Sequence, residues 1–144
     1  DTFFTNSYVH TMGLWMYRDY DWKAHPEYYF WGMVCKYTDI GSEIHPIKSK
    51  DEDVCMIAFK LPDGSWSYMM TNNGASNKKV AVVYGKEDRA KTLSAYKITE
   101  SLIPEDRAVV LPEAYASVDS SKGVSYVTLP PMSFTVLSNK TFQA

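Results

Sequence analysis

Two aspartates separated by a single residue, Asp19 and Asp21, are the carboxylates whose spacing most suggests chemistry. On an extended strand, residues two apart share a face, with their Cα atoms about 6.5–7 Å apart. Two carboxyl groups about 5–5.5 Å apart are the arrangement that cleaves a glycosidic bond with retention of configuration. Arg18 and Lys23 flank the pair and favour ordinary ion pairing. A loop-ordering role, binding of substrate hydroxyls or a solvated surface is therefore favoured over a catalytic dyad.

Aromatic residues surround these aspartates, with Trp15 before them and Trp22 after them. Aromatic residues make up 15% of the chain, including 11 tyrosines and 4 tryptophans. Flat amphipathic rings pack against the C–H faces of a sugar, and they fill β-sandwich cores equally well. For Trp66, Tyr68 and Met70, which share one face of an expected strand, the strongly apolar pattern favours burial.

The other candidate residues form no recognisable catalytic or metal-binding pattern. The three histidines lie 15 and 20 residues apart, and neither they nor the two cysteines have the spacing of zinc ligands. Residues 51–53 are acidic but lack the glycine and glutamate of a calcium loop, which favours a charged linker. Ser133 lacks a Gly-x-Ser-x-Gly context and is expected to be a strand residue. Cys35 and Cys55 are expected to be reduced and buried, although a bridge between them stays open.

Composition and charge restrict the class of protein and its partners. The chain has 144 residues, of which 45% are hydrophobic and 22% charged, as is typical of a globular protein. Its net charge of -2, with both signs interspersed, gives no basic surface that would bind nucleic acid.

No apolar run approaches the roughly 20 residues of a membrane span. There is no glycine-rich phosphate loop, so no cofactor is expected. Because the chain begins at Asp1 without Met, we expect a processed product or an excised fragment.

The first third of the chain, residues 1–47, shows a helix–strand–helix order. Phe4, Tyr8 and Met12 recur at a spacing of four, which indicates a short helix, and residues 14–17 form an apolar run suited to a buried strand. Pro26 begins a second helix whose apolar face is expected to carry Phe30, Val34 and Tyr37, with Met33 beside them. Gly41 is expected to end this helix as its left-handed cap. This order is typical of one and a half units of an α/β repeat.

The rest of the chain, residues 48–144, is typical of an antiparallel β-sandwich of about eight short strands. Residues 44–47 are expected to cross between the two parts, and residues 48–53 to be a linker. Pro62-Asp63-Gly64 predicts a hairpin turn between the first two strands, and the stretch 72–77 predicts a second turn. The pairing order of the strands is not readable from the sequence. The expected strands are Val54–Phe59, Trp66–Met70, Val80–Tyr84, Leu93–Ile98, Ala108–Leu111, Ala114–Val118, Val124–Leu129 and Phe134–Leu137.

Three stretches, in this order, resemble the C-terminal end of a (β/α)8-barrel glycoside hydrolase of the retaining, two-glutamate kind, including the glucosylceramidase- and xylanase-like families. Gly13-Leu14-Trp15-Met16-Tyr17-Arg18-Asp19-Tyr20-Asp21-Trp22 resembles the eighth barrel strand and its aromatic loop. The segment 25–44 resembles the eighth helix running out of the barrel. Leu129-Pro130-Pro131-Met132-Ser133-Phe134-Thr135-Val136 resembles the last strand of the β-sandwich that such enzymes pack beside the barrel.

This resemblance implies that both catalytic glutamates lie before Asp1, so the chain alone is expected to contain no catalytic residue and to be inactive. The substrate-binding candidates are Trp15, Asp19, Asp21 and Trp22. The resemblance implies that Trp15 or Trp22 helps to floor the subsite where the sugar is cleaved. The expected partners are the catalytic barrel of the same enzyme and a carbohydrate, and an extracellular or periplasmic location is favoured. The sandwich would stabilise the barrel of an enzyme that hydrolyses β-linked glycans.

Two other functions are compatible with the sequence. The first is a free-standing carbohydrate-binding module, which requires several aromatic residues on one exposed face of the sandwich. The second is a structural interaction domain. If the barrel is missing, the apolar faces of residues 4–12, 14–17 and 30–37 are expected to be exposed and to favour self-association, unless they fold onto the sandwich. The candidates for a sugar-binding face are Trp66, Tyr68, Tyr84, Tyr96, Tyr115 and Tyr126.

Overall fold

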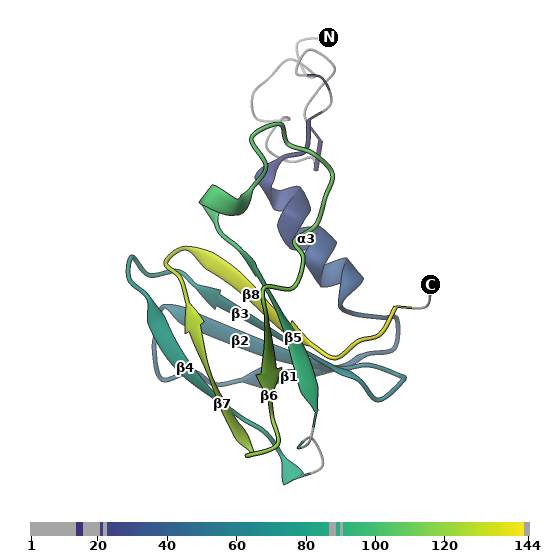
Figure 1. Ribbon diagram of the computed structural model, residues 1–144, viewed down its shortest axis with the longest axis vertical. Coiled ribbons are helices and arrows are strands. Elements are labelled where there is room, and N and C mark those ends of the chain that lie inside the picture. The colour runs from purple at the N-terminus through teal and green to yellow at the C-terminus, as the bar shows by residue number, and fades with distance from the viewer. Residues whose placement is uncertain (1–13, 16–20, 22, 87–88, 90, 143–144) are drawn as a thin grey trace.

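The computed structural model describes residues 14–15, 21, 23–86, 89 and 91–142, and within them the chain is mainly β (Figure 1). Two antiparallel sheets and one α-helix account for its regular structure, which confirms the predicted sandwich. The predicted helix around Phe4, Tyr8 and Met12 lies outside the described residues. The elements are α3 (Pro26–Lys36), β1 (Glu43–Ile47), β2 (Val54–Lys60), β3 (Trp66–Asn72), β4 (Lys78–Val83), β5 (Thr92–Ile98), the short 3₁₀ helix η3 (Glu100–Leu102), β6 (Ala116–Asp119), β7 (Val124–Leu129) and β8 (Ser133–Ser138).

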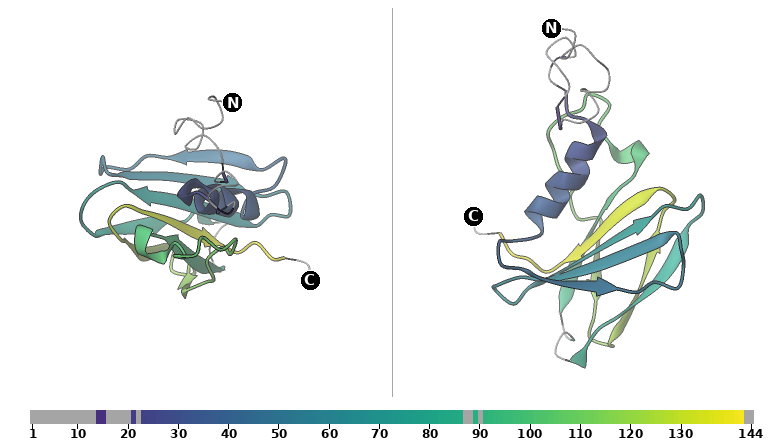
Figure 2. Two further views of the ribbon diagram at one scale, coloured as in Figure 1. Left: turned by 90° about the horizontal axis from the view of Figure 1, so that it is seen from above. Right: turned by 180° about the vertical axis from the view of Figure 1, so that it is seen from behind.

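The large sheet has six strands in the order β1-β2-β3-β8-β5-β6, and the small sheet pairs β4 with β7. Every pairing is antiparallel, from the β1–β2 hairpin to the pairing of β8 with both β3 and β5. The C-terminal strand therefore lies in the middle of the large sheet. In Figures 1 and 2 the small sheet covers one face of the large sheet, and α3 stands against the other face.

The core between the two sheets is built from alternating side chains. Tyr68 and Met70 of β3 and Leu137 of β8 project from the large sheet and pack with apolar residues of β4 and β7. This confirms the predicted burial of the Trp66, Tyr68 and Met70 face, although Trp66 itself is only partly buried. Its partner is the small sheet. Because strand side chains alternate, the intervening residues of β3 and β8 must face α3.

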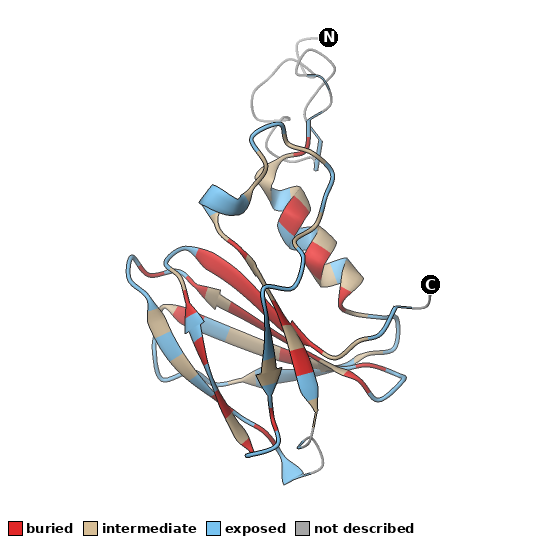
Figure 3. Cartoon of the chain, in the orientation of Figure 1, coloured by how far each residue is buried: buried red, intermediate tan, exposed pale blue. Residues whose placement is uncertain are grey.

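The second core lies between the large sheet and α3. Tyr29 and Met33 of the helix pack with Met69, Phe134 and Val136 of the central strands. Every residue of β8 is buried as a result, which Figure 3 shows along the length of that strand. Because β8 is covered on both faces, it carries no charged residue and consists of apolar residues, serine and threonine.

Helix α3 begins where the sequence predicts and ends earlier. Pro26 occupies the first turn and Glu27 complements the positive end of the helix. The helix ends at Lys36, so the predicted cap at Gly41 is wrong, although Gly41 does adopt a positive φ of 87° in the following turn. The predicted apolar face is correct for Tyr37 and Met33, which are buried in the core, and wrong for Phe30, which is exposed. Tyr29 is a further buried residue of the helix.

Most predicted strands are confirmed, with two corrections. Residues 108–111 are apolar but form no strand; they belong to the long connection between β5 and β6 that runs beside α3. Residues 44–47, expected to cross between two parts of the chain, belong to the edge strand β1, and residues 48–53 are the loop of the β1–β2 hairpin. Pro46 suits an edge, because an edge strand need not donate every hydrogen bond. The division of the chain into residues 1–47 and 48–144 stays a prediction.

Candidate functional site

The predicted aromatic loop is closed at its base by a short antiparallel contact. Trp15 and Ala24 form an isolated β-bridge, and the amide of His25 donates a hydrogen bond of 2.9 Å to the carbonyl of Leu14. His25 is also the residue that precedes α3. The loop therefore starts and finishes beside the N-terminus of the helix, which fixes its base against the rest of the protein.

Two of the four predicted substrate-binding residues are described. Trp15 is 45% exposed, and its ring centroid lies 5.1 Å from that of Tyr28. Asp21 is exposed and has a φ of 60°, a conformation in which aspartate is more frequent than most residues. Asp19 and Trp22 lie outside the described residues. An exposed indole supported by a second ring can stack on a sugar, and a nearby carboxylate can accept hydrogen bonds from its hydroxyls.

The aromatic residues of the sandwich do not gather on one exposed face. Tyr68 and Tyr84 are in the core between the sheets, where their rings meet edge to face at 5.5 Å. Tyr96 packs on the helix side of the large sheet against Tyr37. Tyr115 is exposed just before β6, whereas Tyr126 is exposed on the small sheet. The flat platform that a carbohydrate-binding module requires is therefore not formed by these six residues.

The acidic residues of the β1–β2 loop are paired with a lysine. Lys78 Nζ lies 2.9 Å from a carboxylate oxygen of Asp51 and 2.8 Å from one of Asp53. The hydrogen bond from Lys78 lowers the pKa of Asp51, and the bonds to Asp53 and Asp51 raise the pKa of Lys78. These carboxylates are thus engaged in an ion-pair network at the surface. Over the described part of the chain, no three potential metal ligands come together.

The predictions for the two cysteines and for Ser133 are confirmed only in part. Cys35 and Cys55 are both free thiols, and both are exposed rather than buried, which corrects the expectation. Cys35 lies two residues beyond the buried Met33, on the outward side of α3. Ser133 is a strand residue, as predicted, and its hydroxyl donates a hydrogen bond of 2.6 Å to the carbonyl of Pro130.

A cavity of about 380 Å³ between α3 and the segment 99–115 was missed by the sequence analysis. Tyr29 projects from α3 toward this segment and donates a hydrogen bond of 2.8 Å from its hydroxyl to the carbonyl of Ala108. Burial raises the pKa of Tyr29, which the charge of Arg107 opposes. Leu111 lies over Gly32, where a Cβ atom would come within 2.6 Å of a Leu111 methyl group. The apolar run 108–111 was the available signal, and it indicates packing on the helix.

The fold has counterparts in solved structures. Over 88% of its length the chain is similar to 30% of a glycoside hydrolase family 30 subfamily 8 xylanase from Clostridium acetobutylicum, with a TM-score of 0.69 and 14% sequence identity. Over 82% of its length it is similar to 28% of a family 30 endoxylanase from Clostridium papyrosolvens, with a TM-score of 0.63 and 16% identity. The chain thus spans less than a third of the length of these enzymes. No family model and no curated protein matches the sequence.

This similarity places the fold as one part of larger glycoside hydrolases, in agreement with the resemblance seen in the sequence. The match with the subfamily 8 xylanase extends into the part of the chain that precedes β1. Because 88% of 144 residues is about 127 and only 102 residues follow Ser42, about 25 aligned residues lie before β1. Within the described residues, no helix is long and apolar enough to cross a membrane.

Proposed function

We propose that this chain is the non-catalytic C-terminal portion of a glycoside hydrolase that acts on β-linked glycans with retention of configuration. The observation that carries the proposal is the shared fold, which covers 82–88% of this chain and 28–30% of two xylanases. The sandwich stabilises the catalytic barrel, and the glutamates that act as acid/base and nucleophile belong to the barrel. We also propose an extracellular or periplasmic location, because polysaccharide is accessible there.

The loop from Trp15 to Ala24 is the part of this chain that we assign to the substrate. Trp15 stands exposed at the base of the loop with Tyr28 beside it, and Asp21 is exposed within it. In the proposed enzyme the indole of Trp15, with Trp22, floors the subsite where the sugar is cleaved. Asp19 and Asp21 accept hydrogen bonds from sugar hydroxyls. None of these side chains is assigned an acid, base or nucleophilic role.

The test is an assay of the full-length parent and of residues 1–144 on soluble xylan and on other β-linked glycans. The full-length protein should release reducing ends, and the first product should keep the β configuration when it is followed by NMR. The isolated chain should show no hydrolysis. Hydrolysis by residues 1–144 alone, or a product of inverted configuration, would contradict the proposal.

A further inference from the structure

The ring of Tyr28 supports the exposed indole of Trp15. Trp15 begins the loop that we assign to the substrate, and Tyr28 lies in the first turn of α3. Their ring centroids are 5.1 Å apart and their planes are inclined at 48°, and aromatic pairs attract one another at such separations. Trp15 is nonetheless 45% exposed. Part of the indole therefore remains open to a ligand, while Tyr28 restricts where the indole can lie.

Tyr28 is itself held by Tyr29. The two rings meet edge to face, with centroids 5.4 Å apart and an interplanar angle of 86°. Tyr29 is only 1% exposed, and its hydroxyl donates a hydrogen bond of 2.8 Å to the carbonyl of Ala108. Because Tyr29 is fixed both by packing and by this hydrogen bond, it gives Tyr28 a rigid surface to pack against.

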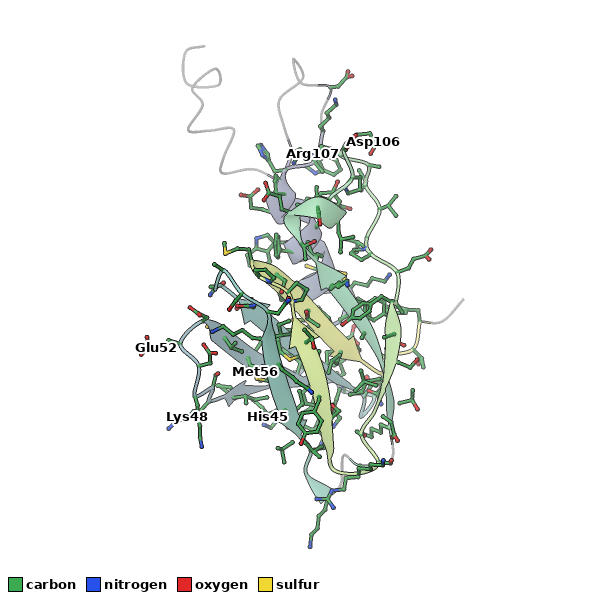
Figure 4. The ribbon with its side chains drawn as sticks, turned by 60° about the vertical axis from the view of Figure 1, so that its left-hand side comes forward. His45, Lys48, Glu52, Met56, Asp106 and Arg107 are labelled. Atoms are coloured by element: carbon green, nitrogen blue, oxygen red, sulfur yellow. The ribbon has the colours of Figure 1, made fainter. Side chains whose placement is uncertain are left out.

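The acceptor of this hydrogen bond belongs to a well-fixed turn. The amide of Arg107 donates to the carbonyl of Pro104 at 2.9 Å, and the amide of Ala108 donates to a carboxylate oxygen of Asp106 at 3.0 Å. Arg107 has a φ of 55°, which a residue other than glycine keeps only where its surroundings enforce it. Its Nη1 atom is buried without a hydrogen-bond partner among the described residues, a further cost that the surrounding contacts must offset. Figure 4 shows Arg107 beside α3, well away from His45, so this turn can anchor Tyr29.

We propose that Tyr28 is a positioning residue for substrate binding, whose ring holds the indole of Trp15 in the orientation that meets the sugar. This inference rests on the proposed function. The β-bridge between Trp15 and Ala24 already fixes the backbone of Trp15, so the freedom that remains is that of the side chain, which Tyr28 limits. A side chain held in its binding position before the ligand arrives loses less conformational entropy on binding.

Kinetics of the full-length parent on soluble xylan test the role of Tyr28. Tyr28→Leu should raise KM about two- to tenfold and change kcat by less than about twofold, because the aromatic pair helps to hold the sugar and takes no part in the chemical step. Tyr28→Phe should keep the wild-type KM, since the ring makes the contact. A merely structural role would lower the amount of folded enzyme, and hence the apparent kcat, at an unchanged KM. That result would overturn the inference.

A double-mutant cycle shows whether Tyr28 acts through Trp15. Trp15→Ala should itself raise KM, and the addition of Tyr28→Leu should raise it no further, because the supported ring is already absent. Additive effects of the two substitutions would overturn the inference. The control is Phe142→Leu, which removes a ring that packs edge to face on Tyr37 at the other end of α3 and should leave KM unchanged. A rise in KM for Phe142→Leu equal to that for Tyr28→Leu would also overturn the inference.

The inference and the proposed function fail in different ways. If Trp15→Ala raises KM but Tyr28→Leu does not, the role of Tyr28 is refuted and the assignment of the loop to the substrate stands. If Trp15→Ala has no effect, or if the parent hydrolyses no β-linked glycan, the proposed function is refuted together with the inference.

Discussion

At the scale of single residues, Asn72 shows how one buried amide joins two turns of the sandwich. Its Nδ2 atom lies within 2.8–3.0 Å of the carbonyl oxygens of Ser76, Leu129 and Pro130, and its Oδ1 atom accepts a hydrogen bond from the amide of Gly74. The side chain is fully buried. It therefore connects the β3–β4 turn to the β7–β8 turn and satisfies backbone groups that water does not reach.

Replacement of Asn72 by alanine should lower the free energy of unfolding by about 2–4 kcal/mol, because it leaves several buried backbone groups unpaired. The measurement is urea denaturation, compared with Asn77→Ala, since Asn77 is exposed in the same turn region. A loss no larger than that of the Asn77 variant would show that the hydrogen bonds of Asn72 do not hold the turns together.

The buried tyrosines predict a loss of stability in alkali. Burial, with the hydrogen bond and charge of Tyr96, raises the pKa of Tyr37 well above its usual range, and burial also raises the pKa of Tyr84 and Tyr29. A tyrosine whose pKa is raised by folding stays neutral in the native state but ionises in the unfolded state near pH 10. Its contribution is therefore complete below about pH 10 and is lost as the pH rises further.

Thermal unfolding between pH 8 and pH 11 tests this dependence. The Tm should be level up to about pH 9.5 and then fall, and Tyr37→Phe should make the fall shallower because one ionisable group is removed. A Tm of the wild-type chain that rises or stays level through pH 11 would contradict the assigned directions.

At the scale of elements, Lys140 ties α3 to the segment after β8. Its Nζ atom donates hydrogen bonds of 3.0 Å to the carbonyls of Lys36 and Thr38 and lies 2.7 Å from a carboxylate oxygen of Asp39. A cation at a helix C-terminus satisfies the last carbonyls and complements the helix dipole. The helix is thereby held to the central strand of the sheet, through a contact about 100 residues away in the sequence.

Lys140→Met should retain the aliphatic stem but remove these contacts, with a loss of about 1–2 kcal/mol. Hydrogen exchange should be faster at the C-terminal turn of α3 and unchanged in β4 and β7. The control is Lys122→Met, since Lys122 is exposed in the β6–β7 turn. Exchange accelerated equally in α3 and in the small sheet would mean that Lys140 acts on global stability and has no specific role at the helix.

Many helices, strands and turns are predicted from the sequence because residues close together in the chain determine them. The turn at Gly64, which has a φ of 84°, follows from Pro62-Asp63-Gly64, and the alternation in the segment 124–129 follows from one buried face. The errors arise where contacts distant in sequence decide the structure. In the run 108–111, Leu111 packs over Gly32 of α3 and the carbonyl of Ala108 accepts a hydrogen bond from Tyr29, so the run follows the helix without forming a strand. Strand β1, in contrast, is mostly exposed and carries Pro46.

At the scale of the whole molecule, the protein is layered as helix, large sheet and small sheet, as Figure 2 shows. The pairing of β8 between β3 and β5 joins segments far apart in the chain, and no local pattern encodes it. The same holds for the candidate site. The sequence points to Trp15 and Asp21 by residue type, but the cavity at Tyr29 and the unpaired Arg107 depend on the packing of a loop against a helix.

The central claim is that this chain is one part of a larger glycoside hydrolase, and the mass of the intact native protein tests it most directly. Because the chain corresponds to 28–30% of the matched xylanases, the intact protein should be about three times the 16.4 kDa of this chain. Its additional sequence should contain a barrel with two strand-end glutamates. A native mass close to 16.4 kDa would contradict the account, since a protein of that size has no room for the barrel.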